Sequence, residues 1–293
     1  MTGTIKNGEM YLFDPTQFAE FGYSHFEGDG FSYRYQFSRK LFWKSIYIPL
    51  GPNCESEQGF DNFLKHIKSQ RFTKVKIDLP AIYSPKRSAQ VIKKLILAGF
   101  KKSNYIQDEE TIIVVNDDLV KMPHSEMNQV RYGLKRADII VKDSVTEEDI
   151  DQIYEIYLVA AKRLEIKPKP KNVFNKMSEK CLVSLAYDKE SGKLEGFLFN
   201  YLIKTDLSEI TNKPSRLLLS LILTGLTDRG RELRLGRAIY YELFKIAFEK
   251  YNVDVADFHG ASRSKGRSYM GFKESFSKRF ISLPGSFTRT KYF

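Results

Sequence analysis

The pattern of apolar and polar positions is clearest between Leu217 and Phe280. A nearly uninterrupted apolar run, Leu217–Thr224, has the length of a buried strand and is too short to cross a bilayer. After a glycine-bounded stretch, apolar side chains recur at helical spacing on one face of Ile239–Lys250, and a second short apolar run follows at Val253–Phe258. This order predicts a unit of strand, loop, helix and strand, around which the rest of the chain is organised.

The same two periodicities predict elements along the rest of the chain. Alternating aromatic side chains at Tyr33, Tyr35 and Phe37 favour a half-buried strand over a platform for stacking nucleic-acid bases. Gly99 is a typical stop for the helix before it, and Ser144 and Thr146, before Glu147 and Glu148, are typical of the capped start of a helix. Further strands are predicted at 41–50, 75–79, 111–115, 182–187 and 194–203, and helices at 57–70, 84–98, 126–137 and 143–163.

Two parts of the chain repeat one order of elements. The strand, helix and strand at 41–50, 57–70 and 75–79 correspond to those at 217–224, 237–250 and 253–258. Each part then reaches a Gly-Phe-Lys sequence, at Gly99–Lys101 and at Gly271–Lys273. We therefore expect an α/β protein of two similar domains, residues 1–145 and residues 146–293.

The stretch that leads into the central helix, Gly225–Ala238, is rich in arginine. It carries Arg229, Arg231, Arg234 and Arg237. Backbone N–H groups are unpaired at a helix N-terminus and the helix dipole is positive there, so a glycine-containing loop at this place can hold a phosphate. An ordinary solvated basic loop is an equal alternative, because a lone glycine pattern is a weak signal.

The positive charge of the chain is concentrated near its end. The net charge is +11, and residues 229–291 contain 14 lysines and arginines against 6 aspartates and glutamates. A localised positive field favours RNA, a phosphorylated substrate or an anionic membrane face as partner, with simple basic solubility as the alternative.

Composition excludes several other classes of protein. With 42% hydrophobic and 28% charged residues the sequence is globular. Cys54 and Cys181 are far apart and are expected to be buried thiols, and the four histidines have no metal-ligand spacing, so no metal site is expected. Residues 1–10 contain no apolar targeting segment and no apolar run reaches 18 residues, so we expect a cytoplasmic protein.

Six segments, taken in order, resemble the FemABX family of peptidoglycan-bridge aminoacyltransferases. They cover most of the chain, and although each is weak alone, the ordered set is moderately specific: Tyr47–Pro52, Lys76–Pro80, Val130–Ala137, Tyr157–Arg163, Val255–Gly260 and Gly271–Phe276. The resemblance implies a mixed α/β fold of two tandem acetyltransferase-like (GNAT) domains. It also implies transfer of an amino acid from its tRNA ester to an amine on the stem peptide of a nucleotide- or lipid-linked cell-wall precursor, without metal or coenzyme A.

The resemblance also implies roles for particular residues. Lys273 matches the family lysine near the reaction centre and would stabilise developing negative charge, with Phe272 holding it in place. Asp78 matches an aspartate that could accept the amine proton or orient the amine, although a turn-forming role is equally compatible. Arg163 matches an arginine that binds precursor phosphate, because a guanidinium fork suits phosphate oxygens; an exposed salt bridge is the alternative.

Other arginines are assigned to phosphate groups of the precursor or of the tRNA backbone. They are expected to position these ligands without reading their sequence. They are Arg131, Arg136, Arg231, Arg234 and Arg237.

Two other functions stay open at this point. The first is a GNAT N-acyltransferase that uses acyl-CoA or an acyl carrier protein: Gly236 and Ala238 fit the end of a pyrophosphate loop, but Leu233 stands where arginine or glutamine is usual. The second is a non-catalytic double-GNAT protein that binds RNA or a membrane-associated partner.

Overall fold

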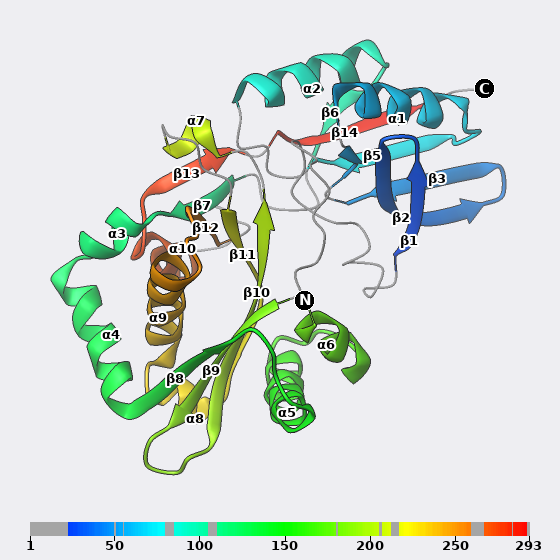
Figure 1. Ribbon diagram of the computed structural model, residues 1–293. Helices are drawn as coiled ribbons and strands as arrows, with labels where there is room; N and C mark the ends of the chain where they lie inside the picture. Colours follow the sequence, from blue (N-terminus) through cyan, green and yellow to red (C-terminus); the bar gives the residue numbers. More distant parts are fainter. Residues whose placement is uncertain are drawn as a thin grey trace.

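A computed structural model shows two mixed β-sheets that lie side by side, with helices packed on them (Figure 1). The structure describes residues 23–49, 51–54, 56–79, 85–104, 110–179, 181–204, 207–211, 217–258, 267–282 and 284–291. Leu50, Pro80, His259, Gly260, the polar loop that follows Gly260 and the aromatic residues before Tyr23 lie outside these residues. Within the described part, each sheet has seven strands.

The first sheet has the strand order β1-β2-β3-β5-β14-β6, with β4 paired to β2. Its apolar face packs against α1 (Glu57–Ser69) and α2 (Pro85–Leu97), and its core includes Ile46, Val75, Ile77 and Phe287. Because side chains alternate along a strand, the opposite face receives the polar residues between them. The strands are β1 (Ser24–Gly28), β2 (Phe31–Lys40), β3 (Trp43–Ile48), β4 (Asn53–Cys54), β5 (Lys74–Asp78), β6 (Lys101–Ser103) and β14 (Ser286–Thr290).

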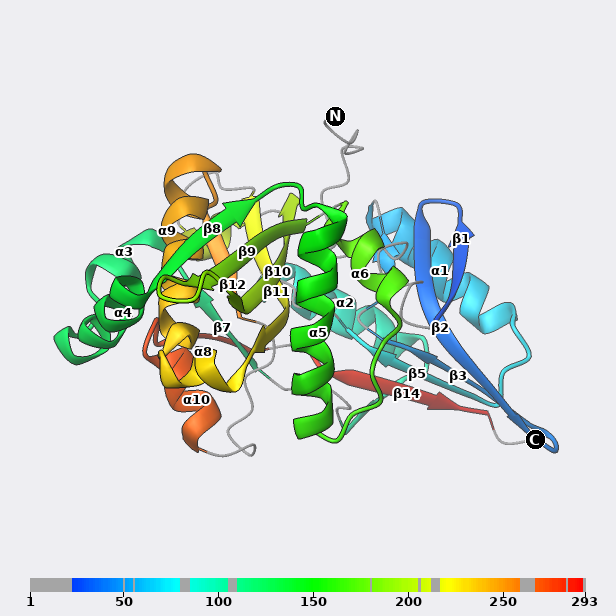
Figure 2. The same cartoon turned by 90° about the horizontal axis from the view of Figure 1, so that it is seen from below.

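The second sheet is covered on both faces. Its strand order is β13-β7-β12-β11-β10-β9-β8, with α9 (Leu235–Lys250) on one face and α5 (Glu147–Arg163) with α6 (Lys171–Ser178) on the other (Figure 2). The pleat separates the two cores: Leu198 faces α9, whereas Phe197 and Phe199 face α5 and α6. The strands are β7 (Glu110–Val114), β8 (Ala137–Lys142), β9 (Cys181–Asp188), β10 (Leu194–Lys204), β11 (Leu217–Leu226), β12 (Val255–Asp257) and β13 (Arg279–Ser282).

Each half of the chain contributes one strand to the sheet formed mainly by the other half. β14, from the end of the chain, lies between β5 and β6 of the first sheet. β7, from the first half of the chain, lies between β12 and β13 of the second sheet. The sheets therefore exchange strands across the boundary expected near residue 145, and that boundary stays a prediction. The internal repeat read from the sequence corresponds to this two-fold arrangement.

Local signals in the sequence account for several element boundaries. The Thr146 hydroxyl accepts from the N–H of Asp149, whose carboxylate accepts from the N–H of Thr146, and this reciprocal pair begins α5. At α1 the cap is a single bond, because the Ser56 hydroxyl accepts from the N–H of Gly59. Gly99 has a φ of +87° after α2, a conformation that glycine adopts without strain.

The basic stretch predicted to be a loop is largely helical. β11 continues to Leu226, and α8 (Asp228–Glu232) begins at once, capped by the Thr227 hydroxyl. Arg234, with a φ of +57°, then separates α8 from α9. A short polar cap followed by an acidic first turn favours this helix, which the glycine and arginine pattern concealed.

The two Gly-Phe-Lys sequences do not occupy equivalent places. Gly99–Lys101 leaves α2 and enters β6, whereas Gly271–Lys273 lies inside α10 (Arg267–Glu274). The predicted correspondence between these two sequences is therefore wrong, although strand, helix and parallel strand do recur as β3, α1 and β5 and as β11, α9 and β12. Three further helices, α3 (Asn116–Val120), α4 (His124–Arg136) and α7 (Ser208–Thr211), complete the described fold.

Candidate active site

Lys273 lies on α10 as a buried side chain, next to the end of strand β12 of the second sheet. It has 5% of its surface exposed, and its Nζ donates to the backbone carbonyl of Phe258 at 3.1 Å. Phe258 directly follows β12, and its ring centre lies 5.8 Å from the same Nζ. Burying an ammonium group is costly unless its N–H groups are bonded. The Phe258 carbonyl satisfies one of these N–H groups.

The neighbouring strands separate at this place. β11 and β12 run parallel and pair at three positions, from Leu218–Val255 to Ser220–Asp257. β12 then ends, while β11 continues to Leu226 along β10. The ladder between β10 and β11 shifts register there, leaving Ile222 as the extra residue of a bulge. The lysine therefore lies near the point where the parallel pairing of β11 and β12 ends.

Phe272 belongs to an aromatic cluster that fixes α10 against α9. Its ring packs edge-on against Tyr240, Phe258 and Phe276, at centroid distances of 5.3 to 6.2 Å. A Cβ on Gly236, in the first turn of α9, would lie 3.8 Å from the Phe272 ring. The residue before Lys273 thus joins the lysine helix to the start of α9, in agreement with a positioning role.

Most arginines of the basic stretch are already paired with carboxylates. Arg229 contacts Asp188 at 3.1 Å, Glu190 at 3.0 Å and Glu232 at 3.8 Å. Arg231 pairs with Asp228, to which Arg163 also comes within 3.8 Å. The sequence analysis missed these partners because Asp188 and Glu190 lie at the β9–β10 turn, about forty residues earlier in the chain.

Arg237 links the start of α9 to α4. Its Nε lies 2.6 Å from a carboxylate oxygen of Glu126, and its Nη1 donates to Gln129 at 3.3 Å. Its guanidinium carbon is 5.6 Å from the centre of the Phe272 ring. Arg237 therefore lies beside the aromatic cluster, with its charge balanced by Glu126.

A second group of cations surrounds Tyr132 on α4. The guanidinium carbon of Arg136 lies 3.5 Å from the Tyr132 ring centre, and that of Arg234 lies 5.0 Å from it. Arg131 is exposed on the same helix. Among the residues that the structure describes, Arg131, Arg136 and Arg234 form no ion pair, and guanidinium groups stacked on an aromatic ring keep their N–H edges available for phosphate oxygens. They are the better candidates for phosphate.

Asp78 is fully buried in a polar network of the first sheet. Its carboxylate accepts from the Tyr47 hydroxyl at 2.6 Å and from the hydroxyl of Ser286 on β14. Asp257, also fully buried, occupies the corresponding place at the end of β12 and accepts from the hydroxyl of Thr111 on β7. Each aspartate therefore accepts a hydrogen bond from a hydroxyl group on the strand that the other half of the chain contributes. Asp78 belongs to the first sheet, whereas Lys273 lies on α10 beside the second.

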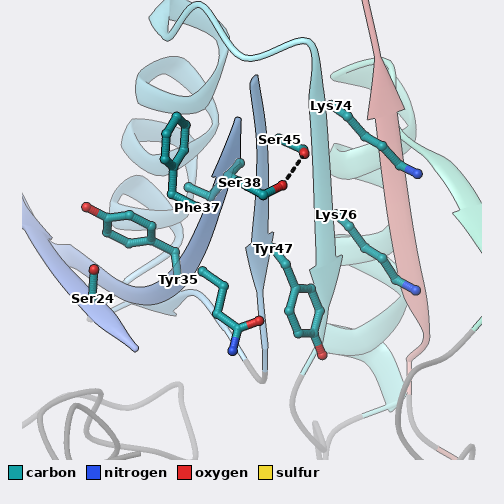
Figure 3. A pocket seen from close by; sticks show the side chains of 10 residues that line it. Ser24, Tyr35, Phe37, Ser38, Ser45, Tyr47, Lys74 and Lys76 are labelled. Atoms are coloured by element: carbon teal, nitrogen blue, oxygen red, sulfur yellow. Dashed lines mark hydrogen bonds between the residues drawn. The ribbon is translucent and has the colours of Figure 1, made fainter. Parts of the chain in front are cut away.

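A cavity of about 640 Å³ lies on the face of the first sheet that α1 and α2 do not cover (Figure 3). Tyr47, Lys74 and Lys76 line it, and Ser38 and Ser45 are hydrogen-bonded to each other at 2.8 Å beside them. Tyr47 therefore links this cavity to Asp78. The sequence carried a signal for this face, because polar residues at 74, 76 and 78 alternate with Val75 and Ile77.

A buried arginine lies on the same polar face. Arg34 is 5% exposed, and its Nε donates to the carbonyl of Pro49 at 3.1 Å. Burial lowers the pKa of Arg34 to about 10, and the nearby hydroxyl groups of Tyr23 and Tyr47 oppose that change. The face thus carries three basic side chains, Arg34, Lys74 and Lys76.

The part of the chain that the structure describes contains no cluster of three or more histidine, cysteine, aspartate or glutamate side chains that could hold a metal ion. Among the helices described, none has the length and apolar content to cross a membrane.

Each half of the fold contains a parallel pair of strands, β3 with β5 and β11 with β12, and the whole has a tandem GNAT-like fold, as its similarity to solved structures shows. The chain is similar to the crystal structure of FemX, with a TM-score of 0.68 and 14% identity over 94% of this chain and 90% of that one. It is also similar to the C-terminal domain of a putative lysylphosphatidylglycerol synthetase from Agrobacterium fabrum, with a TM-score of 0.65 and 9% identity over 93% and 85% of the two chains.

A third similar structure is a tandem GNAT protein from the clavulanic acid biosynthesis pathway. Its TM-score is 0.50, with 10% identity over 89% of this chain and 78% of that one. No family profile matches the sequence, and no curated protein matches it. These likenesses establish the fold.

Proposed function

We propose that the protein transfers an aminoacyl group from aminoacyl-tRNA to an amine on the stem peptide of a peptidoglycan precursor. The amine nitrogen attacks the ester carbonyl, the C–N bond forms and the C–O bond to the ribose breaks. One proton passes from the amine to the departing ribose oxygen. This chemistry requires an aligned ester and stabilisation of the oxyanion, and it needs no cofactor.

The observation that carries this proposal is the buried amino group of Lys273, which is bonded to the carbonyl of the residue directly after β12. A cation held in a site of low exposure stabilises an oxyanion more strongly than it would in water. The Phe258 carbonyl and the Phe272 cluster hold the lysine in place, so little reorganisation is required when negative charge develops. Lys273 is the residue that we assign to catalysis, and Phe272 is a positioning residue.

The donor tRNA would be held by the cations around Tyr132. Arg131, Arg136 and Arg234 lie on α4 and at the start of α9, the same helix whose first turn borders Phe272. Arg163, Arg231 and Arg237 already contact carboxylates, and they would have to share or exchange these partners to bind phosphate. We therefore assign the primary phosphate contacts to the first three arginines and secondary contacts to the others.

The acceptor would use the cavity of the first sheet. Its volume of about 640 Å³ falls within the range of ligand sites, roughly 300 to 1,000 Å³. Lys74 and Lys76 can bind precursor phosphate there. Asp78 acts on this site through Tyr47, whose hydroxyl it accepts, so we assign to Asp78 the positioning of the acceptor pocket.

The second candidate is an acyl-CoA-dependent N-acyltransferase, because Gly236 and Ala238 lie in the first turn of α9. α4 packs closely on this turn: a Cβ on Gly133 would meet Ala238 at 2.7 Å and the carbonyl oxygen of Arg234 at 3.2 Å. One side of the turn is thus already covered. That contact favours tRNA over a pyrophosphate bound as in acyl-CoA enzymes.

The test is transfer of labelled amino acids from a total aminoacyl-tRNA pool to nucleotide-linked precursor, lipid-linked precursor and phosphatidylglycerol. Acyl-CoA donors are assayed in parallel. Label on a precursor only when charged tRNA is present is the expected result and identifies the amino acid. Label from acyl-CoA alone would support the second candidate, label on phosphatidylglycerol would change the acceptor, and RNA binding without any transfer would indicate a non-catalytic protein.

A further inference from the structure

The turn between β2 and β3 exposes a group of large apolar side chains. Leu41 is 86% exposed, Phe42 is 89% exposed and Trp43 is 52% exposed, and Phe37 on the adjoining strand is 50% exposed. We name residues 39–44 the hairpin tip. Figure 2 shows it projecting past the body of the sheet. A contiguous exposed apolar group of this kind marks an interaction surface.

The residue types in this turn differ from those that a tight, solvent-exposed hairpin turn usually contains. Lys40 and Trp43 form the last pair of the ladder, so Leu41 and Phe42 make a two-residue turn. Such turns favour asparagine, aspartate and glycine, because they need left-handed backbone conformations. Leu41 adopts a φ of +48°, which an L-residue with a bulky side chain seldom does. The chain accepts backbone strain in order to present leucine and phenylalanine at the point of the hairpin.

Positive charge surrounds the hairpin tip. The parts of the chain at this end of the sheet, residues 36–46, 65–75 and 288–291, contain nine lysines and arginines and no aspartate or glutamate. Thr73 joins them: its N–H donates to the carbonyl of Lys44 at 2.8 Å, and its carbonyl accepts from the N–H of Lys291 at 2.9 Å. The exposed cations of this region are Arg39, Lys40, Lys65, Lys68, Arg71, Lys74 and Lys291.

We propose that the hairpin tip docks the protein on an anionic lipid bilayer, with Leu41, Phe42 and Trp43 in the interfacial layer. Apolar side chains that project beyond a ring of lysines and arginines fit a surface with an acidic outer layer and an apolar interior. Tryptophan favours this boundary, because its ring has an apolar body and a polar N–H. A protein partner would need carboxylates arranged around an apolar pocket, whereas an anionic bilayer supplies both features everywhere.

Docking by this hairpin would also orient the cavity of the first sheet. Phe37, Ser38, Ser45 and Lys74 line the cavity and belong to the same strands as the tip, or to the strand beside them (Figure 3). A ligand whose apolar part stays in the bilayer could therefore place its polar part in the cavity. The inference itself rests on the hairpin tip and does not depend on the proposed function.

The experiment measures binding of the full chain to phosphatidylcholine vesicles and to equimolar vesicles of phosphatidylcholine and phosphatidylglycerol. Trp43 is the single tryptophan of the chain, so its emission reports the position of the tip directly. We expect binding to the anionic vesicles, a blue shift of Trp43 emission and quenching of Trp43 by brominated lipid. High salt should weaken this binding, because it screens the cations.

Two variants separate the apolar and charged contributions. Leu41→Ser combined with Phe42→Ser should lower the partition coefficient by about tenfold or more, given the area removed from the interface. Arg39→Gln combined with Lys40→Gln should lower it by about fivefold or more on anionic vesicles and reduce the salt dependence. Leu97→Ser and Val120→Ser remove apolar side chains of similar exposure, 74% and 80%, and should leave binding unchanged.

Three results would overturn the proposal. They are Trp43 emission that does not respond to anionic vesicles, equal binding by the Leu41→Ser and Phe42→Ser double variant, and equal binding to neutral vesicles. The emission test uses the wild-type chain, so it remains decisive if a variant fails to fold. Binding lost in the Leu97→Ser control as well would also contradict a role confined to the hairpin tip.

Discussion

The two halves of the molecule share a framework and differ in what they place on it. In each half a strand ends at a fully buried aspartate, Asp78 or Asp257. Each aspartate accepts a hydrogen bond from a hydroxyl group on the strand contributed by the other half. A feature present in both halves belongs to the fold. What differs is that the second half adds the buried Lys273, whereas the first leaves one sheet face open as a polar cavity.

This difference separates structural residues from candidate chemical ones more clearly than any motif. Gly-Phe-Lys occurs in both halves of the sequence but occupies unrelated places, whereas the two aspartates share no motif and occupy related ones. The comparison assigns Asp78 first to the framework and Lys273 first to the chemistry. Four experiments test this comparison of the two halves, in order of decreasing effect.

The largest expected effect is the loss of stability when the packing of the exchanged strand β14 is weakened. Phe287 on β14 is 1% exposed within the first core, and Phe287→Ala should lower the free energy of unfolding by about 3–5 kcal/mol, from lost burial and the cavity left behind. Chemical denaturation measures this change. Thr290→Ala, on the same strand but half-buried, is the control and should cost much less. A Phe287→Ala protein as stable as wild type would mean that β14 contributes little to the first sheet.

Removing the buried cation should abolish most transfer without unfolding the chain. Lys273→Met keeps the length of the side chain, and we expect transfer to fall by at least about tenfold, since an oxyanion-stabilising group is lost. Steady-state kinetics, together with a melting curve, separates activity from stability. Lys278→Met is the matched control, because Lys278 is largely exposed and pairs with Glu274. Wild-type activity in Lys273→Met would refute the proposed role.

The two aspartates should respond alike if both are framework residues. Asp78→Asn and Asp257→Asn should each lower stability by about 1–3 kcal/mol, because a buried carboxylate that accepts hydroxyl donors is replaced by an amide. Their effects on kcat should be small once stability is taken into account. A far greater loss of kcat in Asp78→Asn than in Asp257→Asn would move Asp78 from the framework to the chemistry.

The smallest expected effect is the change in the free energy of unfolding at acid pH. Burial lowers the pKa of His66 in the first half, where the imidazole is hydrogen-bonded to the Tyr33 hydroxyl at 3.0 Å. The folded state therefore disfavours the protonated ring. Stability from His66 is present above its unfolded pKa of about 6.5, and it declines as pH falls through that value towards the lower folded pKa.

Asp149 in the second half should respond in another pH window. Burial alone would raise its pKa, but the Lys142 ammonium at 2.8 Å and the N–H of Thr146 together hold that pKa below the usual range. Its stabilisation should persist above about pH 3.9 and be lost as pH falls through the lower folded pKa. Stability curves of His66→Gln and Asp149→Asn against wild type should differ in these separate windows. Coincident windows would contradict both assignments.

The sequence predicted the elements well where hydrophobic periodicity was strong. The strand from Leu217, the helix from Glu57 and the capped helix after Thr146 all occur where that pattern predicts them. Short strands such as β6, β13 and β14 were missed, because a few residues carry too little periodicity to be recognised. The exchange of β7 and β14 could not be foreseen, since each pairs with strands more than a hundred residues away.

The candidate site was predicted less completely. The sequence singled out Lys273 through its motif, but nothing local showed that it is buried or that the Phe258 carbonyl holds it. Arg229 and Arg231 looked like free cations until folding brought Asp188 and Glu190 to the first and the turn of α8 brought Asp228 to the second. Net charge along a sequence says little about which charges remain unpaired. The hairpin tip was readable in principle, since leucine and phenylalanine are poor residues for a tight turn.

The exchange of β7 and β14 between the sheets also constrains the order in which the protein can fold during synthesis. Ser286 pairs with Asp78 across 208 residues of chain, so the first sheet cannot close while the ribosome still holds β14. Until then, β5 and β6 present unpaired edges, which are templates for pairing with other chains. The first sheet should therefore reach its native state only after β14 has left the ribosome, and a chaperone that covers strand edges would be most useful in that interval.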